Sequence, residues 1–180
     1  MIRLSAFSDE AASDLSGQIS ALKRNGIGYT ELRSIDGKNV AKFTEAEAKE
    51  YAKRLAGEGV AVWAIGSPLG KADIDTDFSA CLDEVKHVCA LANIFGTDKI
   101  RVFSFFNAYE KRGQVFDYLS EMAETAAEYG AGLYHENEKE VYGDTAAGVL
   151  ELMANVRGLK FVYDPANYIQ VGEDADTTLS

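Results

Sequence analysis

Residues 130–139 are Gly-Ala-Gly-Leu-Tyr-His-Glu-Asn-Glu-Lys, a short apolar segment with glycine before it and acidic and amide side chains after it. The segment 132–136 has the length of a buried strand, and Gly130 is a typical end for a preceding helix. Residues 136–139 place several polar groups directly at the carboxyl end of this strand. A helix, a buried strand and a polar strand end together predict one βα unit of a parallel sheet.

The same unit recurs in both directions along the chain. Apolar segments of strand length alternate with amphipathic segments of helix length, and glycine stands where each helix should end. Each unit has about the 30 residues that a right-handed βαβ crossover requires, so the sheet is expected to be parallel. The expected strands are residues 2–7, 29–33, 60–65, 99–105, 132–136 and 160–163.

The helices between these strands carry capping and packing signals. Thr44 and Glu47 form a capping-box pattern at the start of one helix. Asp144 is expected to cap the helix after the fifth strand, with Leu150 and Met153 on the side that faces the core. Each helix is therefore expected to pack one apolar stripe against the sheet.

Two architectures accept alternating strands and helices: an open doubly wound sheet and a closed eight-stranded barrel. Residues 8–12 contain no glycine, which argues against a dinucleotide site after the first strand. Polar residues instead follow nearly every strand, as in a barrel whose active site is assembled from strand ends. They are Ser8, Asp9, Glu10, Arg33, Ser67, Lys71, Ser104, Asn107, residues 136–139, Asp164 and Asn167.

The chain is short for this fold class, an α/β (β/α)₈ TIM barrel. Such a barrel usually takes about 250 residues, and this chain has 180. We therefore expect one domain over residues 1–180 that lacks its last two βα units. Six strands without closure would leave two sheet edges open to pairing with other chains. A truncated chain, an incomplete sequence, or a partner chain that covers the gap would each account for this length.

Composition limits the partners and the compartment. The net charge of −11 repels a phosphate backbone and gives no attraction to anionic lipid, so nucleic acid and membrane partners are disfavoured. No signal peptide or membrane-spanning segment is evident, so a cytoplasmic location is expected. Cys81 and Cys89 fall in one expected helix, too far apart along its axis for a disulfide, and are expected to be free thiols.

Two neighbouring strand ends carry the carboxylates best suited to chemistry. Glu136 ends the fifth strand and Asp164 follows the sixth. Neighbouring parallel strands lie about 4.8 Å apart, so carboxylates at matching heights could share one divalent ion. Oxygen ligands favour Mg²⁺ or Mn²⁺, with Zn²⁺ also open. Helix capping and loop solvation form the alternative interpretation of the same acids.

Six strand-end motifs stand in series along nearly the whole chain: residues 4–10, 31–33, 66–71, 101–105, 135–139 with 142–145, and 164–167. In this order they resemble the strand-end motifs of the sugar phosphate isomerase/epimerase family, whose fold is the xylose isomerase-like TIM barrel. The resemblance implies a metal-dependent isomerase or epimerase of a small sugar, sugar phosphate or related polyol. It also implies a role in carbohydrate metabolism.

The resemblance further implies a four-residue metal site, with Glu from the fifth strand, Asp from the sixth, His from the seventh and Glu from the eighth. By that implication Glu136 and Asp164 are the first two ligands, and Glu136 is also the catalytic base that removes a proton next to a carbonyl. The other two ligands have no counterpart here, so the chain alone is expected to be inactive. A dehydratase on the same scaffold and a non-catalytic sugar-binding or structural remnant are the alternatives.

Further candidates for substrate binding lie at or near other strand ends, and each has a structural alternative. For Asn167 the alternative is a hydrogen bond within its turn, and for Glu138 it is a loop salt bridge with Lys139. For Arg101 and Glu31, which are charged residues within strands, the alternative is an ion pair inside the barrel. His135 alternates with Glu136 along the strand and is expected to pack on the other face. The sequence leaves open which sugar, which metal and whether the chain forms a homo-oligomer. The candidates are Asn167, Glu138, Lys71, Arg101 and Glu31.

Overall fold

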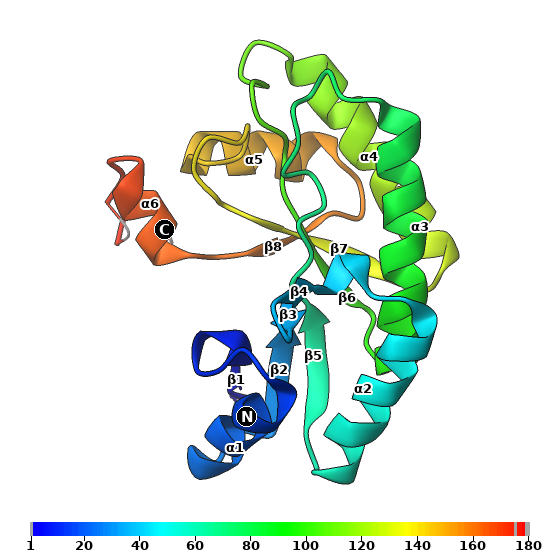
Figure 1. The fold of residues 1–180 in the computed structure, drawn as a ribbon. Helices are drawn as coiled ribbons and strands as arrows, with labels where there is room; N and C mark the ends of the chain where they lie inside the picture. Colours follow the sequence, from blue (N-terminus) through cyan, green and yellow to red (C-terminus); the bar gives the residue numbers. More distant parts are fainter. Residues whose placement is uncertain (1, 175, 179–180) are drawn as a thin grey trace. The chain divides into compact units, whose positions relative to one another are not determined.

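Short strands alternate with helices along the chain in the computed structural model, which describes residues 2–174 and 176–178 (Figure 1). The chain divides into two compact units, Met1–Ser67 with Lys86–Ile100, and Pro68–Val85 with Arg101–Ser180. The single domain expected from the sequence stays a prediction. In the described part of the chain, the helices are too short or too polar to cross a membrane.

The first unit contains the amino-terminal strands and helices. Strand β1 pairs in parallel with β2, and β2 pairs in parallel with β5. Ile65 at the end of β5 pairs with Ile100 of β6. The elements are β1 (Ser5–Ala6), η1 (Ser8–Glu10), α1 (Leu15–Arg24), β2 (Tyr29–Leu32), β3 (Ser34–Ile35), β4 (Lys38–Asn39), η2 (Val40–Lys42), α2 (Glu45–Gly57) and β5 (Ala61–Ile65).

The second unit contains the later strands and helices, while α3 (Phe78–Phe95) and β6 (Lys99–Val102) contribute residues to both units. Strands β7 and β8 are parallel, with Glu136 opposite Val162. The six strands follow one another in the sheet order β1-β2-β5-β6-β7-β8, which confirms the predicted βα repeat. The remaining elements are α4 (Arg112–Glu128), β7 (Gly132–Glu136), α5 (Ala146–Asn155), β8 (Lys160–Val162) and α6 (Pro165–Gln170).

Local signals place several element ends where the sequence predicts them. The capping box at α2 is confirmed, because Glu47 N donates to Thr44 Oγ1 at 3.2 Å and Thr44 N donates to Glu47 Oε2 at 2.7 Å. A hairpin of β3 and β4 was not predicted. Its turn residues, Asp36 and Gly37, have φ values of 53° and 73°, and an Asp-Gly pair is the typical signal for such a turn.

Two predicted strands are shorter in the structure by more than one residue. Strand β1 covers only Ser5–Ala6 of the predicted residues 2–7, and Ile2 and Leu4 are 91% and 67% exposed. As an edge strand, β1 pairs along one side only. Strand β6 ends at Val102, because the chain after it turns to pair with a loop of its own unit.

The predicted start and inner face of α5 are wrong. Thr145, and not Asp144, is the N-cap, because its side chain accepts from Gly148 N. Leu150 and Met153 are 64% and 57% exposed, whereas Leu152 is fully buried. The buried side of the helix contains Gly148 and, four residues later, Leu152. A Cβ added at Gly148 would lie 2.6 Å from the Tyr142 carbonyl oxygen, so the helix packs too closely there for a side chain.

The loop after β5 is tied to the segment after β6 by backbone hydrogen bonds. Phe103 N donates to Leu69 O at 2.8 Å, and Phe105 N donates to Gly70 O at 3.0 Å. Gly70 has a φ of 79°, and a Cβ there would lie 2.0 Å from the Phe103 carbonyl oxygen. Only glycine fits both the left-handed backbone and this close approach. The position of Lys71, the next residue, depends on this contact.

We predict that Gly70→Ala lowers the free energy of unfolding by about 2 kcal/mol or more, because the new methyl group meets backbone atoms that cannot rotate away. Chemical denaturation followed by circular dichroism measures this change. Gly113→Ala is the matched control, since nothing lies within 4 Å of its Cβ position in α4, and it should be neutral or stabilising by up to about 1 kcal/mol. Equal effects of the two substitutions would contradict the prediction.

Candidate functional site

The candidate site lies at the carboxyl ends of β7 and β8 in the second unit. Glu136 is the last residue of β7 and pairs with Val162 of β8. Asp164 follows Val162 by two positions, so strand alternation places it on the same side of the sheet as Glu136. The Asn137 side chain fixes the two strand ends together, because its amide donates to Asp164 O and accepts from Asp164 N, both at 2.8 Å.

Glu136 forms an ion pair with Arg101. Arg101 Nη1 lies 2.9 Å from Glu136 Oε2, and the two side chains are only 14% and 10% exposed. This agrees with the structural alternative predicted for Arg101, an ion pair within the barrel strands. Removing one partner of such a buried pair would leave an uncompensated charge.

The pKa of Glu136 is raised above its ordinary value, and burial of the carboxylate is the main cause. The positive charge of Arg101 lowers this pKa, whereas the negative charges of Asp164 and Glu138 raise it. These opposing effects require all three charged groups to lie near Glu136, since Coulomb interactions fall off with distance and are screened by water. Asp164 and Glu138 thus act electrostatically on Glu136, and a metal ion shared by Glu136 and Asp164 stays a prediction.

Asp164 caps the amino terminus of α6. Its Oδ1 accepts from Ala166 N at 2.8 Å and from Asn167 N at 3.2 Å, and its Oδ2 accepts from Asn167 Nδ2 at 3.2 Å. Helix capping, the alternative interpretation of this acid, is thus one of its roles. The side chain of Asn167 also accepts from Gln170 Nε2 at 3.2 Å, so Asn167 stabilises the same first turn.

A second ion pair joins Lys71 to Glu138. Lys71 Nζ lies 2.6 Å from Glu138 Oε2, and the side chains are 34% and 21% exposed. Sequence reasoning offered Lys139 as the salt-bridge partner of Glu138, but Lys139 contributes only its backbone N–H, at 3.2 Å from Glu138 Oε1. The Lys71 ammonium also lies 4.4 Å from the centroid of the Phe103 ring.

Glu31, the remaining predicted substrate residue, belongs to the first unit. Its Oε1 accepts from Ser5 Oγ at 2.6 Å, which ties β2 to β1. The structure thus places Glu31 in a hydrogen bond within its own unit.

His135 is fully buried on the face of β7 away from Glu136, as predicted. Its Nε2 lies 2.9 Å from Ser104 Oγ, which also accepts from Gly143 N at 2.8 Å. Within the described residues, its Nδ1 has no hydrogen-bond partner. Complete burial lowers the pKa of His135 to about 3, so the ring stays neutral and serves packing.

The side chains of Glu136 and Asp164 are of a type that binds divalent ions, but two carboxylates form only part of a metal site. Their hard carboxylate oxygens are the donors that Mg²⁺ and Mn²⁺ prefer. Repulsion from Asp164 adds to the burial that raises the pKa of Glu136, and a cation held by the two acids would relieve that repulsion. Among residues 2–174 and 176–178, however, no group of three histidine, cysteine, aspartate or glutamate side chains is positioned to hold a metal.

Sequence reasoning missed Asn137 and Phe103. Both stand within motifs at strand ends, but the alternation of strand faces gave no reason to assign them a role. Asn137 fixes the height of Asp164 beside Glu136, and Phe103 supports Lys71 and Arg101. Their roles depend on which loop lies beside each strand end, and the sequence pattern does not contain that information.

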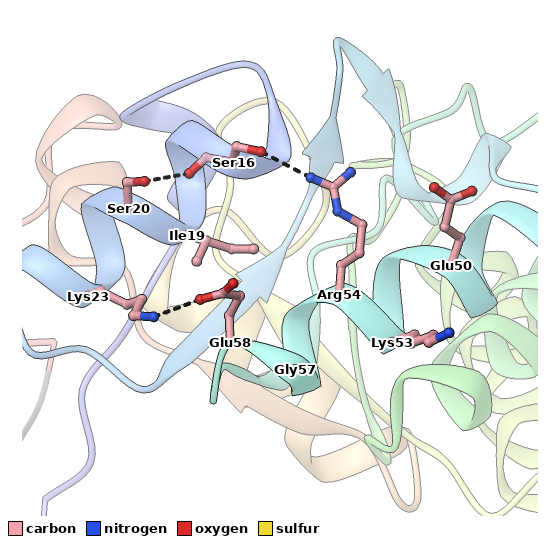
Figure 2. A pocket seen from close by; sticks show the side chains of 9 residues that line it. All are labelled: Ser16, Ile19, Ser20, Lys23, Glu50, Lys53, Arg54, Gly57 and Glu58. Carbon is pink, nitrogen blue, oxygen red and sulfur yellow. Dashed lines mark hydrogen bonds and ion pairs between the residues drawn. The ribbon is translucent and has the colours of Figure 1, made fainter.

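A groove in the first unit, with a volume of about 820 Å³, lies between α1 and α2 (Figure 2). Three of its charged side chains have partners, because Lys23 pairs with Glu58 at 2.7 Å and Arg54 donates to Ser16 Oγ at 3.0 Å. Its two carboxylates belong to Glu50 and Glu58, and Glu58 is already paired with Lys23. The chemistry therefore points to the strand ends of the second unit and not to this groove.

The comparisons with known proteins agree on the fold. A family model described as the xylose isomerase-like TIM barrel matches residues 19–179. No curated protein sequence matches the chain. The expected fold class is confirmed: six parallel strands alternate with helices and match an incomplete barrel of this type.

Three solved structures illustrate the similarity. The probable 3-DHS dehydratase AsbF of Bacillus anthracis is 20% identical, with a TM-score of 0.78, over 99% of this chain and 68% of that one. An L-ribulose 3-epimerase is 18% identical, with a TM-score of 0.71, over 96% and 63%. A xylose isomerase-like TIM barrel protein from Mycobacterium smegmatis in complex with magnesium is 15% identical, with a TM-score of 0.71, over 93% and 65%. At such identities the likeness shows the fold.

The depressed pKa of His135 predicts a pH-dependent loss of stability. Between pH 6.5 and 3 the imidazole of His135 binds a proton in the unfolded chain but stays neutral in the folded chain. The free energy of unfolding therefore falls as the pH falls. From pH 6.5 to 4 this single group lowers the free energy of unfolding by about 3 kcal/mol. The stability advantage of the wild type over His135→Gln should therefore shrink by that amount.

Denaturant titrations at a series of pH values measure this change. His87→Gln is the control, because it removes the other histidine of the chain, which is partly exposed in α3. A stability difference between wild type and His135→Gln that stays constant with pH would contradict the assignment of a neutral, buried His135.

Proposed function

Because the chain belongs to the xylose isomerase-like TIM barrel family, we propose that Glu136 and Asp164 serve a metal-dependent isomerase or epimerase. The substrate would be a small sugar, sugar phosphate or related polyol, and the reaction would proceed by removal of a proton next to a carbonyl. One observation carries the proposal. Glu136 is a buried carboxylate at a strand end whose pKa is raised by burial and by two neighbouring acids.

Glu136 has the properties of a general base. A raised pKa makes its carboxylate a stronger proton acceptor, while the nearby positive charge of Arg101 favours the ionised form that can accept the proton. Arg101 engages Oε2 at 2.9 Å, and this contact fixes the orientation of the carboxylate. Removing a proton next to a carbonyl develops enediolate charge, so the base must act where positive charge is close at hand.

The proposed metal site uses the same two acids. Glu136 and Asp164 would hold Mn²⁺ or Mg²⁺, with Zn²⁺ also open, and the ion would supply Lewis-acid stabilisation of the developing charge. The similar Mycobacterium smegmatis protein was crystallised with magnesium. Asp164 is restrained for this task because α6 and Asn137 hold its side chain and backbone.

The remaining candidates would contact the substrate. Glu138 and Asn167 lie at the same strand ends and offer a carboxylate and an amide to sugar hydroxyls. Lys71 and Arg101 offer positive charge, and a substrate contact for Glu31, which accepts from Ser5 within the first unit, stays a prediction. We propose the cytoplasm as the compartment, since both cysteines are free, as is usual where thiols are kept reduced.

A dehydratase is the second candidate, because the dehydratase from Bacillus anthracis gives the TM-score of 0.78 over 99% of this chain. Both reactions can begin with a proton removed next to a carbonyl. They differ in the second step, because an epimerase returns a proton to carbon, whereas a dehydratase expels a hydroxyl group. The fold alone does not decide between them.

We predict that a version of the chain extended by roughly 80 residues, to the usual barrel length, binds Mn²⁺ with Glu136 and Asp164 among its ligands, and that Glu136→Gln and Asp164→Asn in this version each weaken the affinity roughly tenfold or more. Asparagine preserves the cap of α6, so D164N tests ligation with little cost to the fold. Electron paramagnetic resonance of free Mn²⁺ measures the affinity. Glu151→Gln is the control, because Glu151 accepts from Tyr142 and pairs with Arg112 in the same unit. Equal affinities of all four proteins would exclude a site at these acids.

Carbon-bound proton exchange tests the reaction itself. The 180-residue chain and a version extended by roughly 80 residues, to the usual barrel length, are incubated with ketoses and Mn²⁺ in D₂O. The extended form should incorporate deuterium next to the carbonyl and form the epimer, and Glu136→Gln should abolish both, while the short form stays inactive. Loss of water from the substrate would favour the dehydratase. No turnover in either form would favour a non-catalytic remnant.

A further inference from the structure

Two cation–carboxylate pairs lie together beside β7. Arg101 pairs with Glu136, and Lys71 pairs with Glu138. Glu138 contributes to the raised pKa of Glu136, so the two pairs are close enough to interact. Four charged side chains are thus gathered at one strand end, two of each sign.

The ring of Phe103 connects the two cations. Lys71 Nζ lies 4.4 Å and Arg101 Cζ lies 4.9 Å from the centroid of this fully buried ring. Such cation–π contacts favour the charged forms and restrict where the cations can lie. Because the backbone bonds from Leu69 and Gly70 hold this loop against Phe103, Lys71 is a positioned cation and not a freely moving surface lysine.

The two pairs differ in their exposure to solvent. The side chains of Arg101 and Glu136 are 14% and 10% exposed, whereas those of Lys71 and Glu138 are 34% and 21% exposed. A buried pair is costly to separate, but a partly exposed pair exchanges partners at little cost. An ammonium also has three N–H donors, and its bond to Glu138 uses one of them. Lys71 is therefore the cation that can take a further ligand.

The charge at the strand ends favours an anion once the proposed metal is bound. Lys71 and Arg101 are positive, and Glu136, Glu138 and Asp164 are negative, so these side chains carry one net negative charge. A divalent ion changes this to one net positive charge. A substrate with a single anionic group would neutralise that excess, whereas a neutral sugar would leave it unpaired.

We propose that Lys71 binds an anionic group of the substrate, a carboxylate or a phosphate, and so selects acidic polyols over neutral ones. Arg101 stays paired with Glu136 while Lys71 contacts the anion. This inference rests on the proposed function, because it assigns the substrate class of the same site. It extends that function because Lys71 would discriminate between anionic substrates, such as sugar acids or sugar phosphates, and neutral sugars.

The test compares three five-carbon probes that differ in charge: ribonate, ribose 5-phosphate and the neutral ribitol. Each is titrated into the full 180-residue chain with Mg²⁺ present, and binding is followed by two-dimensional ¹H–¹⁵N NMR. One or both anionic probes should bind at least about tenfold more tightly than ribitol. The stronger of the two identifies the anion as carboxylate or phosphate.

Lys71→Met should remove this preference, and Lys71→Arg should retain most of it, because the arginine keeps the positive charge. Lys111→Met is the matched control, since Lys111 is also 34% exposed and forms one ion pair, with Asp75, in the same unit. The control should leave the preference unchanged. The amide spectra of the variants also report whether each one is folded.

The outcomes separate the inference from the proposed function. Equal binding of anionic and neutral probes, or a preference that persists in Lys71→Met, overturns the role of Lys71 and leaves the proposed polyol site intact. Binding of none of the three probes overturns the role of Lys71, whereas the proposed function is decided separately, by proton exchange in the extended form.

Discussion

The carboxylate of Glu136 is held out of water beside a buried arginine, and the rest of the candidate site depends on that arrangement. Burial raises the pKa of Glu136, while Arg101 at 2.9 Å keeps an ionised carboxylate tolerable there. A buried ion pair contributes little to stability compared with apolar packing of the same volume. The pair holds the Glu136 carboxylate in one orientation, as the proposed role of a base requires.

Backbone hydrogen bonds and close backbone contacts fix the positions of Asp164 and Lys71, which lie near the carboxylate of Glu136. Asn137 bonds both backbone groups of Asp164, and the close approach of Gly70 to Phe103 fixes the loop that bears Lys71. These contacts involve main-chain atoms, which have few alternative positions. Binding and catalytic groups supported in this way lose little conformational entropy when a ligand arrives.

The same arrangement suits more than one reaction. Under the proposed function, a base next to a carbonyl and a nearby Lewis acid would serve epimerisation and dehydration alike, and the structurally similar proteins include both an L-ribulose 3-epimerase and a probable 3-DHS dehydratase. Substrate choice then depends on the groups around the base. Lys71 differs from Arg101 in its exposure, so the two cations are suited to different tasks even though both contact Phe103.

The sequence by itself determined the order of strands and helices, the parallel sheet and the gathering of Glu136 and Asp164 at neighbouring strand ends, because periodicity, caps and chain order are local properties. It predicted the wrong cap and inner face for α5, where close packing at Gly148 decides which side is buried. Only the tertiary structure paired Glu136 with Arg101 and Glu138 with Lys71. Those partners are brought together by loops and strands distant in sequence, and their distances depend on packing that no local pattern records.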